Sequence, residues 1–232
     1  MLEIKNITKK FGKNVVLDNI SFVVKAGEAV GILGSNGAGK STLIEIIVGQ
    51  IKATSGEVLL NGEKDVYKNV GIQFQEGVWP KGMTSKLLIK YFKKNWSKKF
   101  DDRTNDLIKI FELDKIMTKD LNQLSGGQKQ RLNALLAIIN NPDYIFLDEM
   151  ITGLDLKMQL RLSDFFKELK KEKKTLVIIS HIPEEVETLC DRVMIIDQGK
   201  IFLDKKLEEV VKTFGSVRNM LIKYYKGELH EK

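Results

Sequence analysis

The stretch Gly34-Ser35-Asn36-Gly37-Ala38-Gly39-Lys40-Ser41-Thr42 decides the fold class, because it fits the spacing G-x-x-x-x-G-K-[ST] in full. It lies between an apolar run at 29–33, typical of a buried strand, and a helical pattern that begins at Lys40. Its glycines leave room for a phosphate to approach the backbone amides. The helix start adds unpaired N–H groups and a partial positive charge. The stretch therefore predicts a loop that binds the phosphates of a nucleotide.

We expect three side chains of this loop to contact the nucleotide or its metal ion. Lys40 should reach the β- and γ-phosphates, Ser41 should bind Mg²⁺, and Thr42 should hold the α-phosphate. The rest of the predicted phosphate-binding set is Gly34, Ser35, Asn36, Gly37, Ala38 and Gly39. The alternative is a chance glycine-rich turn, and the strand-loop-helix context argues against it.

A second pattern is the apolar run Tyr144-Ile145-Phe146-Leu147, which ends in the two carboxylates Asp148 and Glu149. A buried strand of this kind places its last residues at the carboxyl edge of the sheet, where phosphates bind in open α/β folds. Asp148 should therefore hold Mg²⁺, and Glu149 should orient or deprotonate the water that attacks the γ-phosphate. An exposed acidic strand end is the alternative, which the glycine-rich loop makes the weaker one.

Strand and helix patterns alternate on both sides of these motifs. Strands are predicted at 2–7, 20–24, 29–33, 57–60, 69–74, 144–147, 176–179 and 192–196, and helices at 40–48, 156–171 and 183–189. Residues 83–140 show only helical patterns. The predicted fold is α/β: a P-loop NTPase core with a mostly parallel sheet, an N-terminal antiparallel β subdomain and an inserted all-helical subdomain. We place the core in residues 1–76 and 141–232, and the helical subdomain in residues 77–140.

Composition limits the functional classes less than the motifs do. The chain has 232 residues, a net charge of +7 and one cysteine, Cys190, so no internal disulfide is possible and a buried thiol is expected. No stretch approaches the ~18 apolar residues of a membrane span. From 77 to 100 there is no acidic residue, while lysines recur among aromatic residues. This stretch indicates either a solvated face beside an anionic membrane, which we favour, or a nucleic-acid site.

The most discriminating motif is Leu124-Ser125-Gly126-Gly127-Gln128. Ser125 is a good N-cap, and the two glycines leave backbone amides exposed at the start of a helix predicted to run to Ile139. This is a second helix start suited to an anion, in the helical subdomain and far from the first in sequence.

With these three motifs, the chain resembles the nucleotide-binding subunit of ABC transporters over nearly its whole length. Four weaker matches follow in the order typical of the family. The resemblance implies that Phe11 stacks on adenine and that Gln75 contacts Mg²⁺ and senses a membrane partner. It also implies that Asp155 lies at a dimer seam and that His181 contacts the γ-phosphate. Residues Ser125, Gly126, Gly127 and Gln128 would then cap the γ-phosphate of ATP held by a second subunit.

One departure from the family pattern follows the catalytic carboxylate. The family usually has Pro-Thr or Pro-Ser there, whereas this chain has Met150-Ile151. The loss of proline removes a fixed φ, and the loss of the hydroxyl removes a local hydrogen bond. We still expect hydrolysis, because Asp148 and Glu149 are present.

The resemblance implies an ATPase that binds ATP and Mg²⁺, pairs with a second ATPase subunit and powers transport through separate transmembrane permease subunits. The overall pattern is most similar to the ATPases of short export systems, which implies a location at the cytoplasmic face of the cell membrane, held there by the permease. We do not expect nucleic acid as a partner. The alternative is an ABC ATPase without a permease, serving iron–sulfur assembly or the ribosome.

Overall fold

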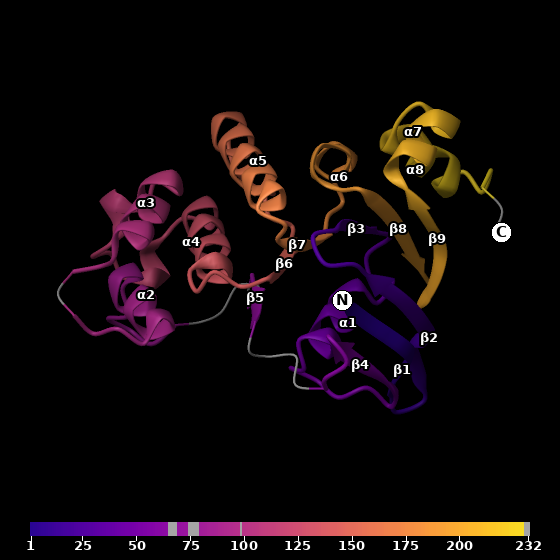
Figure 1. Ribbon diagram of the computed structural model, residues 1–232, viewed down its shortest axis with the longest axis horizontal. Coiled ribbons are helices and arrows are strands. Elements are labelled where there is room, and N and C mark those ends of the chain that lie inside the picture. The colour runs from indigo at the N-terminus through magenta and orange to yellow at the C-terminus, as the bar shows by residue number, and fades with distance from the viewer. Residues whose placement is uncertain (65–68, 74–78, 98, 230–232) are drawn as a thin grey trace.

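The computed structural model describes residues 1–64, 69–73, 79–97 and 99–229 and contains two sheets (Figure 1). The antiparallel sheet has the order β2-β1-β4, with β1 Leu2–Phe11, β2 Asn14–Val24 and β4 Ser55–Leu60. The larger sheet has the order β5-β6-β7-β3-β8-β9. Its strands are β3 Ala29–Leu33, β5 Val70–Ile72, β6 Tyr144–Asp148, β7 Thr175–Ile179, β8 Arg192–Asp197 and β9 Lys200–Lys206. All its pairs are parallel except β8 with β9.

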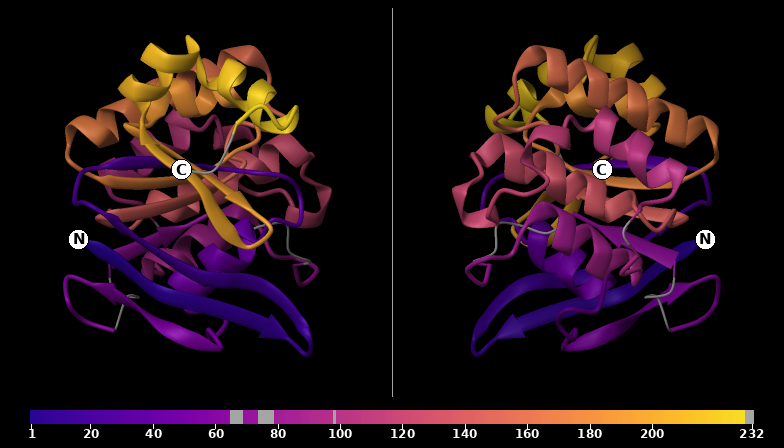
Figure 2. Two further views of the ribbon diagram at one scale, coloured as in Figure 1. Left: turned by 90° about the vertical axis from the view of Figure 1, so that its right-hand side faces the viewer. Right: turned by 90° about the vertical axis from the view of Figure 1, so that its left-hand side faces the viewer.

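The four central strands of the larger sheet, β6, β7, β3 and β8, are buried on both faces, which explains why they are nearly continuous apolar runs rather than alternating ones. In β7, Leu176 and Ile178 join one core cluster, while Val177 and Ile179 join the other. Helix α1 (Lys40–Ile47) and the antiparallel sheet cover the face that carries Val177 and Ile179. The face that carries Leu176 and Ile178 is covered by four helices. They are α5 Leu156–Lys171, α6 Pro183–Leu189, α7 Leu207–Phe214 and α8 Val217–Tyr225. Figure 2 shows these layers on opposite sides of the sheet.

Between β5 and β6 the described chain forms a helical lobe that extends to the left in Figure 1. Its helices are α2 Ser85–Lys93, α3 Asp102–Ile110 and α4 Gly126–Ile138. Thr84 and Asp101 cap α2 and α3 by accepting from Leu87 N and Thr104 N. Helix α4 packs so closely on β5 that a Cβ at Gly71 would lie 1.7 Å from the Ala137 carbonyl oxygen.

Charged side chains join this lobe to the core at one further point. The Arg131 guanidinium donates to the Phe111 carbonyl oxygen at 3.1 Å and lies 3.5 Å from Glu112 Oε2. Arg161, on α5, donates to Glu112 Oε1 at 2.8 Å. Glu112 therefore links α4 of the lobe to α5 of the core.

The predicted fold class is confirmed, and most elements lie where their patterns indicate them. The first two strands are longer than predicted: β1 continues through the mainly polar stretch 8–11, and β2 begins at Asn14. Backbone pairing across the hairpin holds both added stretches. Strand β9 and helices α7 and α8 were not predicted. Phe74, predicted as the end of β5, lies outside the described residues. Cys190 is buried as expected, and burial raises the pKa of its thiol. Among the described residues, no helix is long and apolar enough to cross a bilayer.

Candidate nucleotide-binding site

The sheet topology brings three predicted segments to one edge. Strands β6, β7 and β3 are neighbours and run in parallel, so the residues that follow them emerge together. Backbone hydrogen bonds extend beyond the strands: Glu149 N donates to Ile179 O at 2.9 Å, and Ser180 N donates to Ile32 O at 3.4 Å. The glycine-rich loop, the two carboxylates and His181 therefore meet at the carboxyl edge of the sheet.

A cavity of about 510 Å³ opens at this edge. Its lining residues are Val16, Asn36, Gly37, Gly39, Lys40, Ser41, Thr42, Asp148, Glu149 and Ile179. Backbone amides, an ammonium group and a hydroxyl suit a polyphosphate, and a hydroxyl beside a carboxylate supplies the oxygen ligands that Mg²⁺ prefers. The donor set therefore fits a nucleotide with its metal ion.

The loop backbone has a shape that only glycine permits at two positions. At Gly34, φ is 143° and a Cβ would lie 2.1 Å from the Ile196 carbonyl oxygen. At Gly39, which precedes α1, φ is 102° and no side chain caps the helix. The first amides of α1 are thus left without a side-chain acceptor, which is the condition for binding an anion there.

Lys40 lies across this loop. Its ammonium donates to the carbonyl oxygens of Gly34 and Ser35, at 2.8 Å each. Partial burial lowers the pKa of Lys40, whereas the charges of Asp148 and Glu149 raise it. The ammonium group is therefore held at the loop, where it feels the charges of the carboxylates at the end of β6.

Glu149 has a left-handed backbone, with φ at 52°. Its main chain is fixed by the bond to Ile179 and by the side-chain amide of Gln130, which donates to the Glu149 carbonyl oxygen. Its carboxylate is half exposed, and Oε1 lies 3.1 Å from Nδ1 of His181. A strained backbone at the end of a strand thus aims a solvent-accessible carboxylate at the cavity and at the histidine.

The second helix start lies outside the cavity. Ser125 caps α4 in a capping box: its Oγ accepts from Gln128 N at 3.3 Å, and Gln128 Oε1 accepts from Ser125 N at 3.1 Å. Ser125 and Gly126 are exposed, and residues 125–128 do not line the cavity. A Cβ at Gly127 would lie 3.3 Å from the Gly153 carbonyl oxygen, so this helix start packs against the segment before α5.

Two other predicted residues, Phe11 and Asp155, lie away from the cavity lining. Phe11 lies at the end of β1, is 53% exposed and carries the Lys9 ammonium 4.7 Å above its ring, but it does not line the cavity. Asp155 caps α5 by accepting from Met158 N at 3.0 Å. Gln75 lies outside the described residues.

The structure adds residues that the motifs did not indicate. Val16 and Ile179 line the cavity, and Gln130 holds the backbone of Glu149. The strand pattern at 176–179 could have indicated Ile179, because it is the last residue of a strand predicted to end at this edge of the sheet. Val16 and Gln130 have no such local pattern: the first is an ordinary β-branched strand residue and the second an ordinary helix residue. Their contacts depend on chain segments that are distant in sequence.

Met150 and Ile151 take the place of the usual Pro-Thr by filling the core. They are 0% and 6% exposed. Two backbone bonds close the following turns: Thr152 N donates to Glu149 O at 3.2 Å, and Leu154 N donates to Ile151 O at 3.3 Å. Apolar burial and these turns therefore fix the segment that a proline ring would otherwise restrain.

Comparisons with known proteins agree with this geometry. The sequence profile of a family described as "ABC transporter" matches residues 17–152. The chain is 35% identical to the uncharacterized ABC transporter ATP-binding protein MJ1023 of Methanocaldococcus jannaschii, covering 93% of this chain and 81% of that protein. Nod factor export ATP-binding protein I of Cupriavidus metallidurans is 31% identical (91% and 73% covered). Petrobactin import ATP-binding protein YclP of Bacillus subtilis is 32% identical (92% and 90% covered).

Solved structures of one cassette show the same fold and its nucleotide chemistry. The dimeric bacterial ABC transporter cassette MJ0796 superposes with a TM-score of 0.80 at 28% identity, covering 89% of this chain and 99% of that one. A dimeric post-hydrolysis state of that cassette, bound to ADP and Pi, superposes with a TM-score of 0.79 at 27% identity and the same coverage. This chain therefore belongs to the ABC transporter family as an ATP-binding and ATP-hydrolysing cassette.

Proposed function

We propose that this cassette is the ATPase subunit of an exporter, works as a dimer of two such subunits and drives transport through separate permease subunits. One observation carries this proposal: the chain has two helix starts suited to phosphate, of which only α1 faces the cavity. The other, at Ser125, is exposed outside it. A second subunit that places its Ser125 over the first subunit's cavity would complete both sites.

Within the cavity, we assign the phosphates to the loop of residues 34–42, with Lys40 bound to the β- and γ-phosphates. When phosphate binds, the Lys40 ammonium would exchange the carbonyl oxygens of Gly34 and Ser35 for phosphate oxygens. The free-energy cost of this exchange is small, because the ammonium keeps hydrogen-bond acceptors throughout. Ser41 and Asp148 are the described residues that would hold Mg²⁺, and Gln75 is a further proposed ligand. When bound, the ion would neutralise phosphate charge.

Glu149 is the proposed base for hydrolysis. Its carboxylate orients a water molecule and accepts a proton as the water oxygen attacks the γ-phosphorus, and the bond to the β-phosphate oxygen breaks to leave ADP and phosphate. We propose that His181, whose Nδ1 lies 3.1 Å from that carboxylate, contacts the γ-phosphate. We also propose that Phe11 stacks on adenine and that Val16 contacts the nucleotide from the cavity wall.

The γ-phosphate links the two proposed subunits. The amides at Gly126 and Gly127 approach the ATP of the partner only while that terminal phosphate is present, with Gln128 beside them and Asp155 at the seam. Hydrolysis removes the anion from the Ser125 helix start, so the dimer opens. We propose that residues 77–140 move as the helical subdomain that transmits this change.

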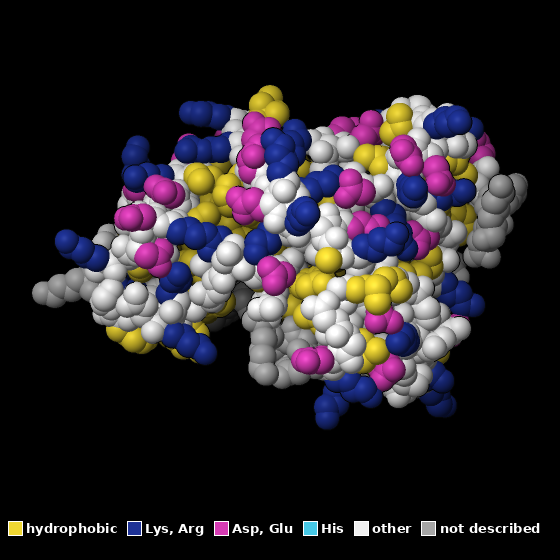
Figure 3. Space-filling model, viewed as in Figure 1, with side chains coloured by type: hydrophobic (Ala, Val, Ile, Leu, Met, Phe, Trp, Pro, Cys, Tyr) yellow, Lys and Arg dark blue, Asp and Glu magenta, His cyan; other side chains and the backbone are white. Residues whose placement is uncertain are grey.

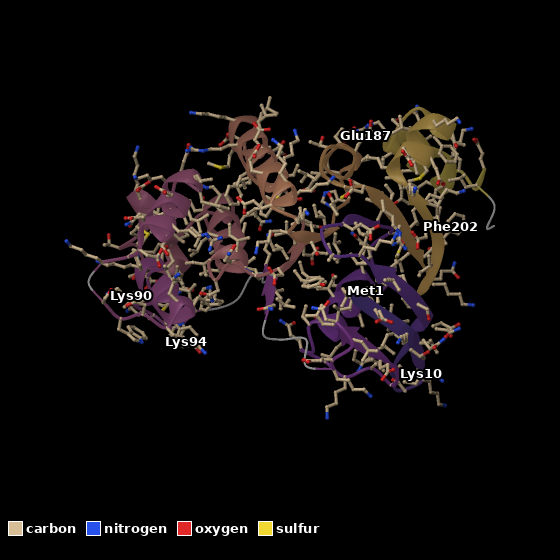
Figure 4. All side chains as sticks on the ribbon, in the orientation of Figure 1. Met1, Lys10, Lys90, Lys94, Glu187 and Phe202 are labelled. Atoms are coloured by element: carbon tan, nitrogen blue, oxygen red, sulfur yellow. The ribbon has the colours of Figure 1, made fainter. Side chains whose placement is uncertain are left out.

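Helix α2 is the proposed permease-facing element. Leu87 and Tyr91 lie one helical turn apart and are 41% and 64% exposed. Lys90 and Lys94 lie on the same lobe, away from the hairpin that carries Lys10 (Figure 4). Acidic and basic side chains are interspersed over the face shown in Figure 3, so that face carries no continuous basic surface of the kind that binds nucleic acid.

Purification of the affinity-tagged chain from detergent-solubilised membranes of cells that express its neighbouring genes tests the permease assignment. The expected result is a stoichiometric complex with a polytopic membrane protein whose substrate-dependent efflux requires ATP. Recovery of the ATPase with soluble partners alone would favour the alternative, an ABC ATPase without a permease. Uptake in place of efflux would overturn only the export assignment, a distinction that matters because relatives are named for both directions.

A further inference from the structure

Glu185, in the first turn of α6, is a buried carboxylate that the proposed reaction does not use. It is 2% exposed. Its Oε2 accepts from the Ser180 hydroxyl at 2.5 Å, and its Oε1 is buried without a hydrogen-bond partner in the described part of the chain. Burying a carboxylate costs free energy unless its hydrogen bonds compensate. Such a group calls for a reason beyond packing.

The partner of Glu185 shapes the turn that carries His181. Ser180 is 1% exposed, and its Oγ also accepts from Ile182 N at 3.0 Å. The hydroxyl therefore spans the turn from Ser180 to Ile182, with His181 at its centre. The single proton of Oγ has two acceptors in reach, Glu185 Oε2 at 2.5 Å and the Ile182 carbonyl oxygen at 3.5 Å. The shorter contact takes the proton, so the orientation of the hydroxyl depends on that carboxylate.

The helix that presents Glu185 is itself firmly held. A Cβ at Gly31 would lie 2.5 Å from a methyl group of Val186, so α6 packs directly on β3. Glu187 accepts from Val217 N at 2.9 Å, which fastens α6 to α8 (Figure 4). Arg218 donates to Glu184 at 2.6 Å. Glu185 is thus presented from a fixed support rather than from a mobile segment.

We propose that Glu185 is a positioning residue for ATP hydrolysis: its carboxylate orients the Ser180 hydroxyl, which fixes the turn that holds His181 against Glu149. This inference rests on the roles proposed above for His181 and Glu149. Glu185 does not touch the nucleotide, and it acts through Ser180.

The electrostatic setting fits such a role. Burial raises the pKa of Glu185 to about 7, with the charge of Glu149 acting in the same direction. The Ser180 hydrogen bond acts against this rise. The buried Cys190 thiol also feels the charge of Glu185. The carboxyl group accepts from Ser180 in its neutral form as well as when ionised, so glutamine is the conservative replacement.

The test compares Glu185→Leu and Glu185→Gln with the control Glu187→Gln on the same helix. We expect Glu185→Leu to lower kcat about tenfold or more with KM for ATP changed less than about threefold, and Glu185→Gln to keep kcat within about threefold. Glu187→Gln should lower the melting temperature and leave kcat unchanged. A wild-type kcat in Glu185→Leu, or an equal loss in Glu187→Gln, would overturn the proposal.

The same substitutions in a His181→Ala background separate the two proposals. If Glu185 acts through His181, Glu185→Leu causes no further loss of kcat there, whereas an additive loss contradicts it. Full turnover in His181→Ala alone would refute the role of the histidine and, with it, the route by which Glu185 is proposed to act. Should Glu185→Leu fail to fold, Ser180→Ala must reproduce the kcat loss with KM retained; wild-type kcat in that variant would overturn the proposal.

Discussion

The two helix starts, at Lys40 in α1 and at Gly126 in α4, solve the problem of unpaired amides in different ways. Helix α1 follows a glycine in a left-handed conformation, has no side-chain cap and opens into a cavity. Helix α4 follows Ser125, has a complete capping box and is exposed. The α1 start leaves its first amides open to a ligand, whereas the α4 start has its own side-chain partners.

This difference suits the two helix starts to different kinds of phosphate contact. An uncapped helix start retains its strongest attraction for an anion and suits the permanent phosphate site. A capped one has one amide satisfied by Ser125, while Gly126 and Gly127 leave the backbone accessible. A partly satisfied helix start suits contacts that form and break during turnover. Four variants test this contrast, from the largest expected effect to the smallest.

Lys40→Ala removes the ammonium from the α1 site and should cause the largest loss. We expect ATP binding and hydrolysis to fall by about 100-fold or more, because a charge-assisted contact to two phosphates disappears in a partly buried site. Titration with a fluorescent ATP analogue measures the loss of affinity, and phosphate release measures the loss of hydrolysis. Lys157→Ala, on the exposed face of α5, is the control and should bind normally. Wild-type affinity in Lys40→Ala would show that α1 is not the phosphate site.

Glu149→Gln keeps the shape of the side chain proposed as the base and removes its basicity. We expect kcat to fall about 100-fold or more while ATP still binds, because general bases contribute roughly 10²–10⁴-fold. With the γ-phosphate retained, the variant should accumulate as a dimer in ATP and Mg²⁺. Light scattering after gel filtration measures this state, and ADP is the control. A rapidly hydrolysing monomer would contradict both the base and the dimer.

Ser125→Ala weakens the α4 side alone. We expect kcat to fall about tenfold with ATP affinity of the monomer unchanged, together with a stability loss of about 1 kcal/mol from the missing cap. Mixed dimers with Lys40→Ala should show that the Ser125 defect acts on the ATP bound by the other subunit. If the defect followed the subunit that carries the substitution, the exposed helix start would have no role across a dimer.

Glu112→Gln should have the smallest effect. It weakens the ion pairs to Arg131 and Arg161, which join the lobe carrying α4 to α5 of the core. Because Glu112 is 44% exposed, we expect below about 1 kcal/mol of stability loss, measured by urea unfolding. Glu168→Gln, which breaks an exposed pair within α5, is the control. A several-fold change in kcat would show that this tie sets the position of the Ser125 helix start.

Much of the site followed from local sequence, because each motif encodes its own backbone. The loop at 34–42 needs glycines, the strand at 144–147 needs apolar residues before two carboxylates, and Ser125 needs only Gln128 three residues on to form its capping box. Helices α5 and α6 begin and end where their patterns indicate. Local propensity and short-range hydrogen bonds are enough to specify such features.

The neighbours of these motifs depended on tertiary structure. The Gln130 side chain donates to the Glu149 carbonyl oxygen from 19 positions away, and His181 lies beside Glu149 from 32 positions away. Val16 reaches the cavity wall from the antiparallel sheet, a separate layer. No local pattern records such contacts. Strand β9 and helices α7 and α8 were also missed, since their mixed polar faces become a core only when packed on β8 and α6.

The sequence by itself determined the local backbone of three segments suited to anions and a metal ion, and it predicted the mostly parallel sheet that connects them. Only the tertiary structure decided that the order β6-β7-β3 gathers two of the segments, with His181, at one edge and leaves the Ser125 helix start outside. The reason is physical: a motif fixes its own backbone through neighbouring residues, whereas strand order and helix packing are fixed by burial of apolar surface across the whole chain.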